Sequence, residues 1–209
     1  MLKEWLLKRA HWIAFGAAVL ATVGDFGQLW VVNAGRPGLT LAAPPGFIIV
    51  PATLAGSLGI PIYGLGYYVR ARQAFGRNPS HATWLALTGA GFGVLGGIVH
   101  AVTGISIATE IGDVTNGLNP MEGIMASGPI VVSLWALATT FFLAAGIAEV
   151  TLPQKHSDRL FNPLFLTLLF TLIASALSSP WNDFVGPAAV NIAHVFFFAR
   201  RAIISRELA

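Results

Sequence analysis

The feature that most constrains this chain is a succession of apolar segments long enough to cross a lipid bilayer, which takes about 20 residues of α-helix. Six segments read this way, at about 11–33, 46–69, 83–107, 127–150, 162–178 and 187–204, and the last two are shorter than the others. Only 10% of the 209 residues are charged and the mean hydropathy is +0.71, far from the composition of a soluble domain. The sequence therefore predicts an all-α, polytopic bundle of six transmembrane helices that forms one domain over residues 1–209.

Turn residues separate these segments and set their expected ends. The breaks carry proline, often beside glycine or asparagine, which end helices or begin them. They lie at Gly35–Arg36–Pro37–Gly38, Pro44–Pro45, Arg77–Asn78–Pro79, Asn119–Pro120, Pro153, Pro163, Pro180 and Pro187. We therefore expect the last helix to begin at Pro187, after a turn formed by Pro180–Trp181–Asn182–Asp183.

Basic residues indicate the orientation. If the amino terminus is cytoplasmic, all but one of the 12 Lys and Arg residues fall inside, and only Arg36 lies outside. Cytoplasmic loops of membrane proteins carry such an excess, so we expect both termini in the cytoplasm and the chain in the cytoplasmic (inner) membrane. The sequence pI of about 9.7 reflects this topology and gives no reason to expect a nucleic-acid partner. Because the chain has no cysteine, disulfides and thiolate metal sites are excluded.

Polar residues within the first segment recur at helical spacing. The stripe consists of Ala14, Ala18, Ala21, Asp25 and Gln28. Residues three and four apart share one face of a helix, so Asp25 is expected to face neighbouring helices and not lipid. We therefore expect the first segment to be a retained helix, because its apolar run is longer than that of a signal peptide and contains Asp25.

Similar stripes mark three other segments. In the third segment the stripe consists of Gly89, Gly93, Gly97, His100 and Gly104. Small residues allow helices to approach closely, so this stripe predicts a packed face that carries one imidazole. Tyr63 ends a comparable face in the second segment, and Asn191 and His194 lie one turn apart in the last.

The depth of the ionisable residues in the membrane predicts that they lie close together. Counted from the outer ends of their segments, Asp25, His100 and His194 each lie about 10–12 Å into the membrane at 1.5 Å per residue. We predict that these three residues converge on one outward-opening cavity and form the catalytic set. The residues expected to contact a substrate are Gln28, Tyr63, Trp135, Trp181, Asn182, Asp183 and Asn191. The alternative is that each polar group only holds two helices together.

Several short motifs form a pattern across the chain. They are Gly24–Asp25, Pro61–Ile62–Tyr63–Gly64–Leu65–Gly66, His100–Ala101 with Gly104, Asn162–Pro163, and Asn191–Ile192–Ala193–His194–Val195–Phe196–Phe197. The pattern resembles a family of uncharacterised bacterial six-helix integral membrane proteins, over most of the chain. That family has no assigned activity, so the resemblance supports the polar positions as a set and implies no reaction.

The residues favour an enzyme that acts on a lipophilic substrate. An acid and imidazoles in low dielectric suit proton transfer to an alkene, an epoxide or an ester. An isoprenoid isomerase or cyclase would also use aromatic side chains to stabilise a cation, here Trp135, Trp181, Phe26 and Phe184. A metal-assisted hydrolase would bind zinc through Asp25, His100 and His194.

Other classes stay open. The same acid and imidazoles would relay protons in a proton-coupled carrier, although no inverted repeat is evident. A b-type cytochrome would use His100 and His194 as axial ligands of haem b. We expect membrane lipids and a lipophilic small molecule as partners, with a homo-oligomer left open. The connection at about 108–126 is long enough to act as a lid over the outer mouth of the cavity.

Overall fold

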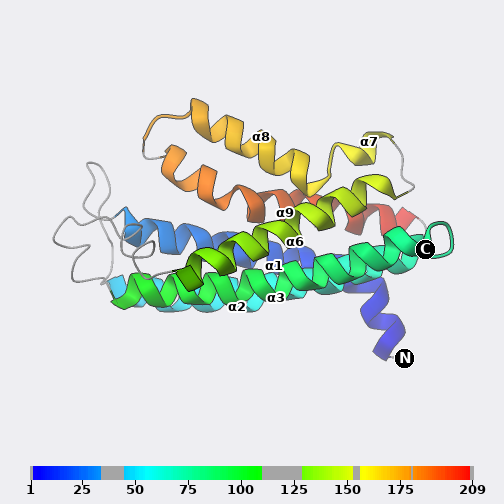
Figure 1. Ribbon diagram of the computed structural model, residues 1–209, viewed down its shortest axis with the longest axis horizontal. Helices are drawn as coiled ribbons and strands as arrows, with labels where there is room; N and C mark the ends of the chain where they lie inside the picture. The colour runs from blue at the N-terminus through cyan, green and yellow to red at the C-terminus, as the bar shows by residue number, and fades with distance from the viewer. Residues whose placement is uncertain (1, 34–44, 110–128, 153–155, 180, 208–209) are drawn as a thin grey trace.

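A computed structural model describes residues 2–33, 45–109, 129–152, 156–179 and 181–207, and these are helical apart from short turns and helix ends. Figure 1 shows the elements and their labels. They are α1 (Leu2–Val32), α2 (Pro45–Ala74), α3 (Pro79–Thr109), α6 (Pro129–Thr151), α7 (His156–Arg159), α8 (Pro163–Ala176) and α9 (Trp181–Glu207). The prediction of an all-α bundle is confirmed for the described part of the chain.

Five of these helices are long and apolar enough to cross a membrane. They are α1 from Arg9 onward, α2, α3, α6, and α9 as far as Ile204. The fifth predicted segment forms α8, an apolar helix of only 14 residues. At 1.5 Å per residue α8 is about 21 Å long, which is less than the hydrocarbon core of about 30 Å.

The start of α9 differs from the sequence prediction. The helix begins at Trp181, six residues before Pro187, and Pro187 lies inside it. A proline inside a membrane helix is tolerated when neighbouring groups satisfy the freed backbone carbonyl. Asn182 and Asp183 therefore lie in the first turn of α9 and not in a loop, and an acidic residue there interacts favourably with the helix dipole.

Proline is the first residue of four of the other helices. α2, α3, α6 and α8 all start with proline, whose missing N–H costs nothing in the first turn of a helix. At α8 the cap is complete, because the Asn162 side chain accepts a hydrogen bond from the Leu164 backbone N–H at 2.9 Å. Asn162 also donates to the backbone oxygen of Gly146 at 2.9 Å and so ties the start of α8 to α6.

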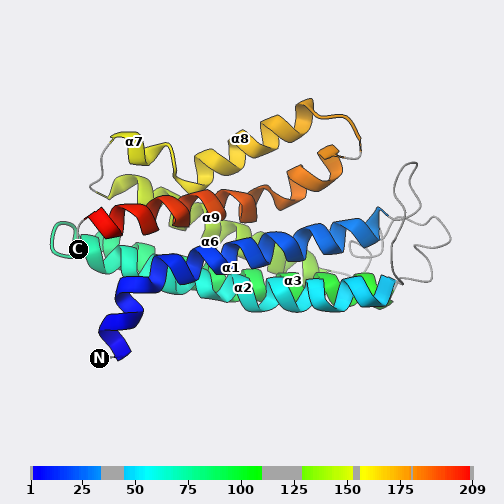
Figure 2. The same ribbon diagram turned by 180° about the vertical axis from the view of Figure 1, so that it is seen from behind.

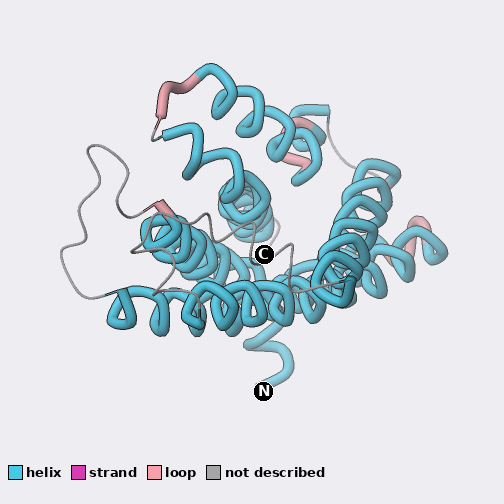
Figure 3. The backbone as a smooth tube through the Cα atoms, turned by 60° about the vertical axis from the view of Figure 1, so that its left-hand side comes forward, coloured by secondary structure: helices cyan, strands magenta, loops and turns pink. Residues whose placement is uncertain are grey.

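The helices pack in an order that differs from their order in the chain. α2 packs between α1 and α3, α3 packs on α6, α1 packs on α9, and α9 packs on α8. The result is a curved row in the order α6, α3, α2, α1, α9, α8, which Figure 2 shows from the side opposite to Figure 1. Figure 3 shows the helices from a direction closer to the bundle axis. The two ends of the row, α6 and α8, touch each other only slightly.

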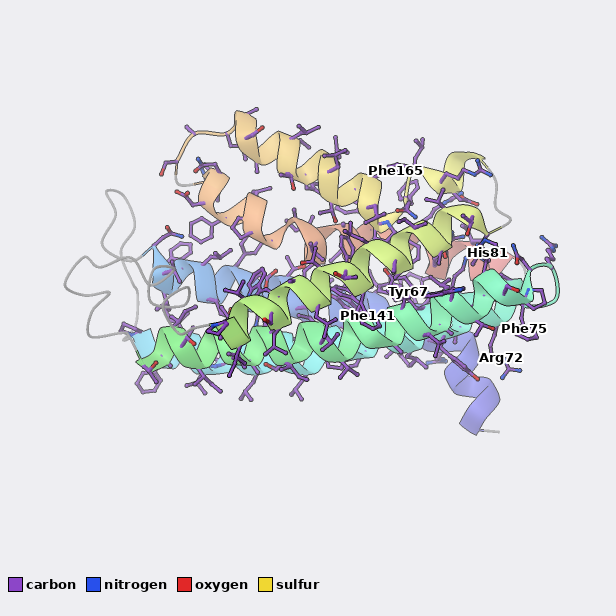
Figure 4. The ribbon with its side chains drawn as sticks, viewed as in Figure 1. Tyr67, Arg72, Phe75, His81, Phe141 and Phe165 are labelled. Carbon is purple, nitrogen blue, oxygen red and sulfur yellow. The ribbon has the colours of Figure 1, made fainter. Side chains whose placement is uncertain are left out.

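The bundle has two ends, which are named here after the helices that are connected there. The α1–α2 end is where α1 ends and α2 begins, and α8 ends and α9 begins at the same end (Figure 1). The α2–α3 end is where α2 ends, α3 begins, α1 begins and α9 ends. Arg72, Phe75 and His81 lie at the α2–α3 end (Figure 4). A core of tightly packed aromatic and small side chains fills the middle of the bundle and includes Tyr67 and Phe198.

Candidate functional site

A cavity of about 590 Å³ lies in the half of the bundle nearest the α1–α2 end. Side chains of α1, α3, α6 and α9 form most of its lining, and α2 and α8 contribute one residue each, Ile60 and Thr167. The lining is mainly apolar, with Asp25 and His100 among its few ionisable groups. Its size falls within the usual range for small-molecule sites, about 300–1,000 Å³.

Asp25 and His100 form a pair at the wall of this cavity. Oδ1 of Asp25 lies 3.3 Å from Nδ1 of His100. The two residues come from α1 and α3, which flank α2, so the imidazole reaches Asp25 by crossing over α2. A glycine makes that crossing feasible, because a Cβ on Gly56 would overlap the His100 ring. Gly24 allows α1 and α2 to approach at the same level, where its Cβ would lie 2.7 Å from the backbone oxygen of Ala52.

The two ring nitrogens of His100 face different partners. Nε2 lies 3.2 Å from the backbone oxygen of Ala52, and a carbonyl can only accept, so Nε2 carries a proton. Nδ1 then faces Oδ1 of Asp25, and the two groups form an ion pair when His100 is protonated. The Asp25–His100 pair therefore places a carboxyl group and an imidazole within 3.3 Å of each other at the cavity wall.

Asn191 and Tyr63 extend this network from the other side of Asp25. Nδ2 of Asn191 donates to Oδ2 of Asp25 at 2.7 Å, and the Tyr63 hydroxyl donates to Oδ1 of Asn191 at 2.7 Å. Gln28 holds the backbone of α3, because its Nε2 donates to the backbone oxygen of His100 at 3.1 Å. Four helices thus contribute to one hydrogen-bonded cluster that fixes the position of the Asp25 carboxyl group.

His194 lies apart from this cluster. Its ring stacks on Tyr63 at 4.5 Å and on Phe92 at 5.2 Å between ring centroids. Nδ1 donates to the backbone oxygen of Val190 at 2.7 Å, and Nε2 lies 2.8 Å from the Tyr67 hydroxyl, which is therefore the donor. The side chain is fully buried and does not line the cavity. The structure brings Asp25 and His100 together, as expected, but not His194.

The length of α9 explains this difference. A helix that began at Pro187 would place His194 only seven residues from its start, but α9 begins at Trp181, so His194 is 13 residues into the helix. At 1.5 Å per residue this is about 20 Å, roughly twice the depth of Asp25 in α1. Asn191, one turn nearer the start of α9, is the residue that reaches Asp25.

The other predicted contact residues divide between the cavity and the surface. Gln28, Trp135, Asn182, Asp183 and Asn191 line the cavity. Tyr63 does not line the cavity, but its hydroxyl group donates a hydrogen bond to Asn191, which does. Trp181 is 62% exposed and is not part of the lining.

The aromatic side chains of the cavity differ from those expected. Phe26 and Phe184 pack on each other, with centroids 6.2 Å apart, and neither lines the cavity. Besides Trp135, the aromatic lining consists of Phe92 and Phe142, which the sequence analysis did not select. Phe92 and Phe142 also contact His194, so this imidazole belongs to an aromatic layer under the cavity.

Three polar atoms on cavity-lining residues have no hydrogen-bond partner within the described chain. They are Oγ1 of Thr103, Oγ1 of Thr167 and Oδ1 of Asn182. Such atoms are costly to bury unless something else satisfies them, such as water or a bound ligand. Asn182 was among the expected contact residues. Of the two threonines, the sequence offers a signal only for Thr103, which follows His100 by three residues on the same face of α3.

A second ionic cluster lies at the α2–α3 end and was also missed. Oε1 of Glu149, in α6, contacts Nε of Arg70 at 2.9 Å and is hydrogen-bonded to Nη2 of Arg201. All three side chains are at most 8% exposed. The two arginines contributed only to the predicted membrane orientation. Glu149 lies at the end of a predicted segment, where charged residues are common, so its position gives no signal for a buried ionic cluster.

The positions of Asp25, His100 and His194 do not favour the zinc and haem alternatives. Within the described residues, no three His, Asp or Glu side chains are close enough to hold a metal ion. The proposed zinc ligands Asp25, His100 and His194 do not face a common position, because His194 is held in the aromatic layer. Both ring nitrogens of His100 and of His194 already face a protein group, so neither imidazole has a free nitrogen to serve as a haem ligand. The expected lid, at about 108–126, lies outside the described residues except for its first two.

In comparisons with protein-family models, curated proteins and solved structures, nothing matched this chain.

Proposed function

We propose that this chain is a membrane-embedded enzyme that uses the Asp25–His100 pair for acid–base chemistry on a lipophilic small molecule held in the cavity. One observation carries the proposal: a carboxyl group and an imidazole lie 3.3 Å apart at the wall of a mainly apolar cavity. Clustered ionisable groups in an apolar environment are expensive unless they share a proton or a polar ligand, and they are commonly functional.

The chemistry follows from the groups that surround the cavity. In its protonated form the pair gives a proton to an alkene, an epoxide or a carbonyl oxygen, and in the other form it removes one. Asn191 holds Oδ2 of Asp25, which orients the carboxyl group. Phe92, Trp135 and Phe142 line the cavity and suit a substrate that develops positive charge, because aromatic faces attract cations. Isomerisation or cyclisation therefore fits the lining better than metal-assisted hydrolysis.

The proposal includes a topology of six spans with both termini in the cytoplasm. Within the described helices, the arginines gather at the α2–α3 end, which supports a cytoplasmic location for that end. α8 is short for a span, and local thinning of the bilayer accommodates such a helix at modest cost. The cavity then lies in the outer half of the cytoplasmic membrane.

A proton-coupled carrier is the second candidate, and the aromatic layer argues against it. Tyr63, Phe92, Phe142 and His194 lie under the cavity in contact with one another, and the core continues beyond them toward the α2–α3 end. A carrier needs a second access route through this layer. Transport would therefore require repacking of the most buried part of the bundle.

The test compares the protein with Asp25→Asn in lipid nanodiscs supplied with a total lipophilic extract of bacterial membranes. Mass spectrometry follows which components disappear and which appear. Loss of an acid–base group typically slows a reaction by about 10²–10⁴-fold, so the conversion seen with the unaltered protein is expected to be absent with Asp25→Asn. Thr140→Ala is the control, since Thr140 is exposed on α6 and outside the cavity. Equal conversion by Asp25→Asn and the unaltered protein would refute the proposal.

A further inference from the structure

The cavity is bounded by two helices that diverge. α6 and α8 meet near the α2–α3 end, where Asn162 donates to the backbone oxygen of Gly146. A Cβ on Gly146 would overlap the side chain of Leu164, so the two helices touch closely at this point. Toward the α1–α2 end the helices separate, as both side views show (Figures 1 and 2), and the cavity lies at that level. The two helices are therefore joined at one end of the bundle, and their backbones diverge toward the other.

One face of α6 forms the rim of an opening to this cavity. Trp135, Thr139 and Leu143 are spaced four residues apart and so lie on one face of the helix. All three line the cavity and are also exposed at the surface, Trp135 by 46% and Leu143 by 47%. Thr167 lines the cavity from α8. Around it, α8 is covered with exposed apolar side chains such as Leu168 and Leu172, and Phe165 points away from the bundle (Figure 4). The opening thus faces the surroundings that lipid chains occupy.

The charges of the cavity restrict the polar end of its ligand. Asp25 and Asp183 line it, and the described lining contains no lysine or arginine. An anionic group would meet the two carboxylates in a low dielectric, and His100, the described lining residue that could offset its charge, already faces Asp25, so binding an anion is unfavourable. A hydroxyl group, by contrast, both donates and accepts hydrogen bonds. It therefore suits a lining that offers polar groups of both kinds, Oδ1 of Asn182, which only accepts, and the threonine hydroxyls, which do either.

We propose that the ligand is a lipid with an uncharged hydroxyl end and an apolar chain, and that it reaches the cavity sideways from the bilayer between α6 and α8. This inference rests on the proposed function, because it names the substrate class and the access route of the same site. The hydroxyl end binds among the polar groups of the lining, which include Thr103, Thr167 and Asn182, and the chain extends along the rim formed by Trp135, Thr139 and Leu143.

The first experiment compares two photoreactive probes in nanodiscs of zwitterionic lipid. One is a long-chain alcohol with a diazirine in the middle of the chain, and the other is the carboxylic acid of equal length with the same diazirine. Mass spectrometry locates the labelled peptides. We expect the alcohol to label the cavity-lining peptides of α3 and α6 several-fold more than the acid does. Equal labelling by both probes, or labelling confined to lipid-facing surfaces, would overturn the proposed ligand class.

The second experiment closes the opening after the protein has folded. The chain contains no cysteine, so Thr139→Cys provides a single thiol at the rim, which a bulky maleimide then modifies. Thr140→Cys is the matched control, because Thr140 is the next residue on α6 and is also exposed but does not line the cavity. We expect modification to reduce cavity labelling by the alcohol several-fold in Thr139→Cys and to leave it unchanged in Thr140→Cys. If both modified variants label like the unmodified protein, or both lose labelling alike, the lateral route is wrong.

These results are independent of the proposed chemistry. Labelling measures occupancy, whereas conversion of lipids measures catalysis. If Asp25→Asn converts lipids as well as the unaltered protein, the catalytic proposal fails, although alcohol labelling that depends on the thiol at position 139 still supports the access route. If conversion depends on Asp25 but labelling is insensitive to the plug, the enzyme stands and the lateral route fails.

Discussion

Two polar clusters lie in opposite halves of the bundle, and they differ in what surrounds them. Near the α1–α2 end, Asp25 and His100 stand beside a cavity, together with polar atoms that lack a partner in the described chain. Near the α2–α3 end, Glu149 is enclosed between Arg70 and Arg201. Both clusters join residues that are far apart in the sequence. One is open to a ligand, and the other is closed by its own side chains.

This difference indicates a division of roles. Removing one partner of an enclosed ion pair leaves an uncompensated charge in low dielectric, so the Glu149 cluster should determine stability. A cluster at a cavity wall can exchange its proton with whatever enters, and its contacts contribute less to folding. The comparison predicts that stability and activity respond to substitutions in opposite halves of the bundle.

The largest effect on stability is expected from Glu149→Ala. The substitution leaves the guanidinium groups of Arg70 and Arg201 without their shared carboxylate, and breaking a buried pair costs about 3–5 kcal/mol. Denaturant titration of the purified protein in detergent micelles measures the free energy of unfolding. Asp158→Ala is the comparison, because Asp158 pairs with Arg200, whose side chain is 28% exposed and can be solvated, and acts on Arg201 less than Glu149 does. An equal loss in both variants would contradict the special role of the enclosed cluster.

A smaller loss is expected from Gly56→Ala. The new methyl group would overlap the His100 ring, and overpacking of this kind costs about 1–3 kcal/mol. Because the ring must move away from Asp25, catalytic conversion should also fall. Gly16→Ala is the matched control, since Gly16 is an exposed glycine of α1 whose Cβ would meet nothing within 4 Å. If Gly56→Ala retains both the stability and the conversion of Gly16→Ala, His100 does not depend on this crossing.

Asp25→Asn should change stability still less. Asn191 can donate to the new side-chain oxygen as it does to the carboxylate, and polar contacts between membrane helices average about 0.6 kcal/mol. The free energy of unfolding, measured under the conditions used for Glu149→Ala, should therefore change by about that amount even though conversion is lost. A destabilisation as large as that of Glu149→Ala would show that Asp25 serves the fold, and the contrast between the two clusters would disappear.

The fold could be predicted from the sequence to the extent that hydropathy determines it. Each apolar segment forms a helix, because a chain in lipid must satisfy its backbone hydrogen bonds internally. The start of α9 was missed, since Pro187 was interpreted as a helix start although a membrane helix accommodates proline. The packing order, in which α6 and α8 are distant in the chain yet bound the same opening, leaves no pattern in a single sequence.

The site was predictable where helical spacing carried the information. Asp25, His100 and Asn191 lie on the faces that their stripes indicated, and they meet. The error at His194 came from the helix start and not from its face, because its face is the one that points inward. Thr167 gave no signal, since threonine is common on apolar helices and its importance depends on a cavity that several helices form together.

The smallest effect is expected from Thr103→Val, and it has the opposite sign. Valine has nearly the shape of threonine, and Oγ1 of Thr103 has no partner within the described chain, so its removal should leave stability unchanged or raise it by a few tenths of a kcal/mol. Thr88→Val is the control on the same helix, because the Thr88 hydroxyl donates to the backbone oxygen of Trp84 at 2.7 Å and its loss should cost about 0.5–1.5 kcal/mol. Denaturant titration of both variants measures the difference. If the hydroxyl of Thr103 serves a ligand, Thr103→Val should also lose part of its labelling by the alcohol probe, whereas Thr88→Val keeps it. A loss of stability in Thr103→Val equal to that of Thr88→Val would mean that the hydroxyl contributes to the fold, and the argument from unpartnered atoms at the cavity would fail there.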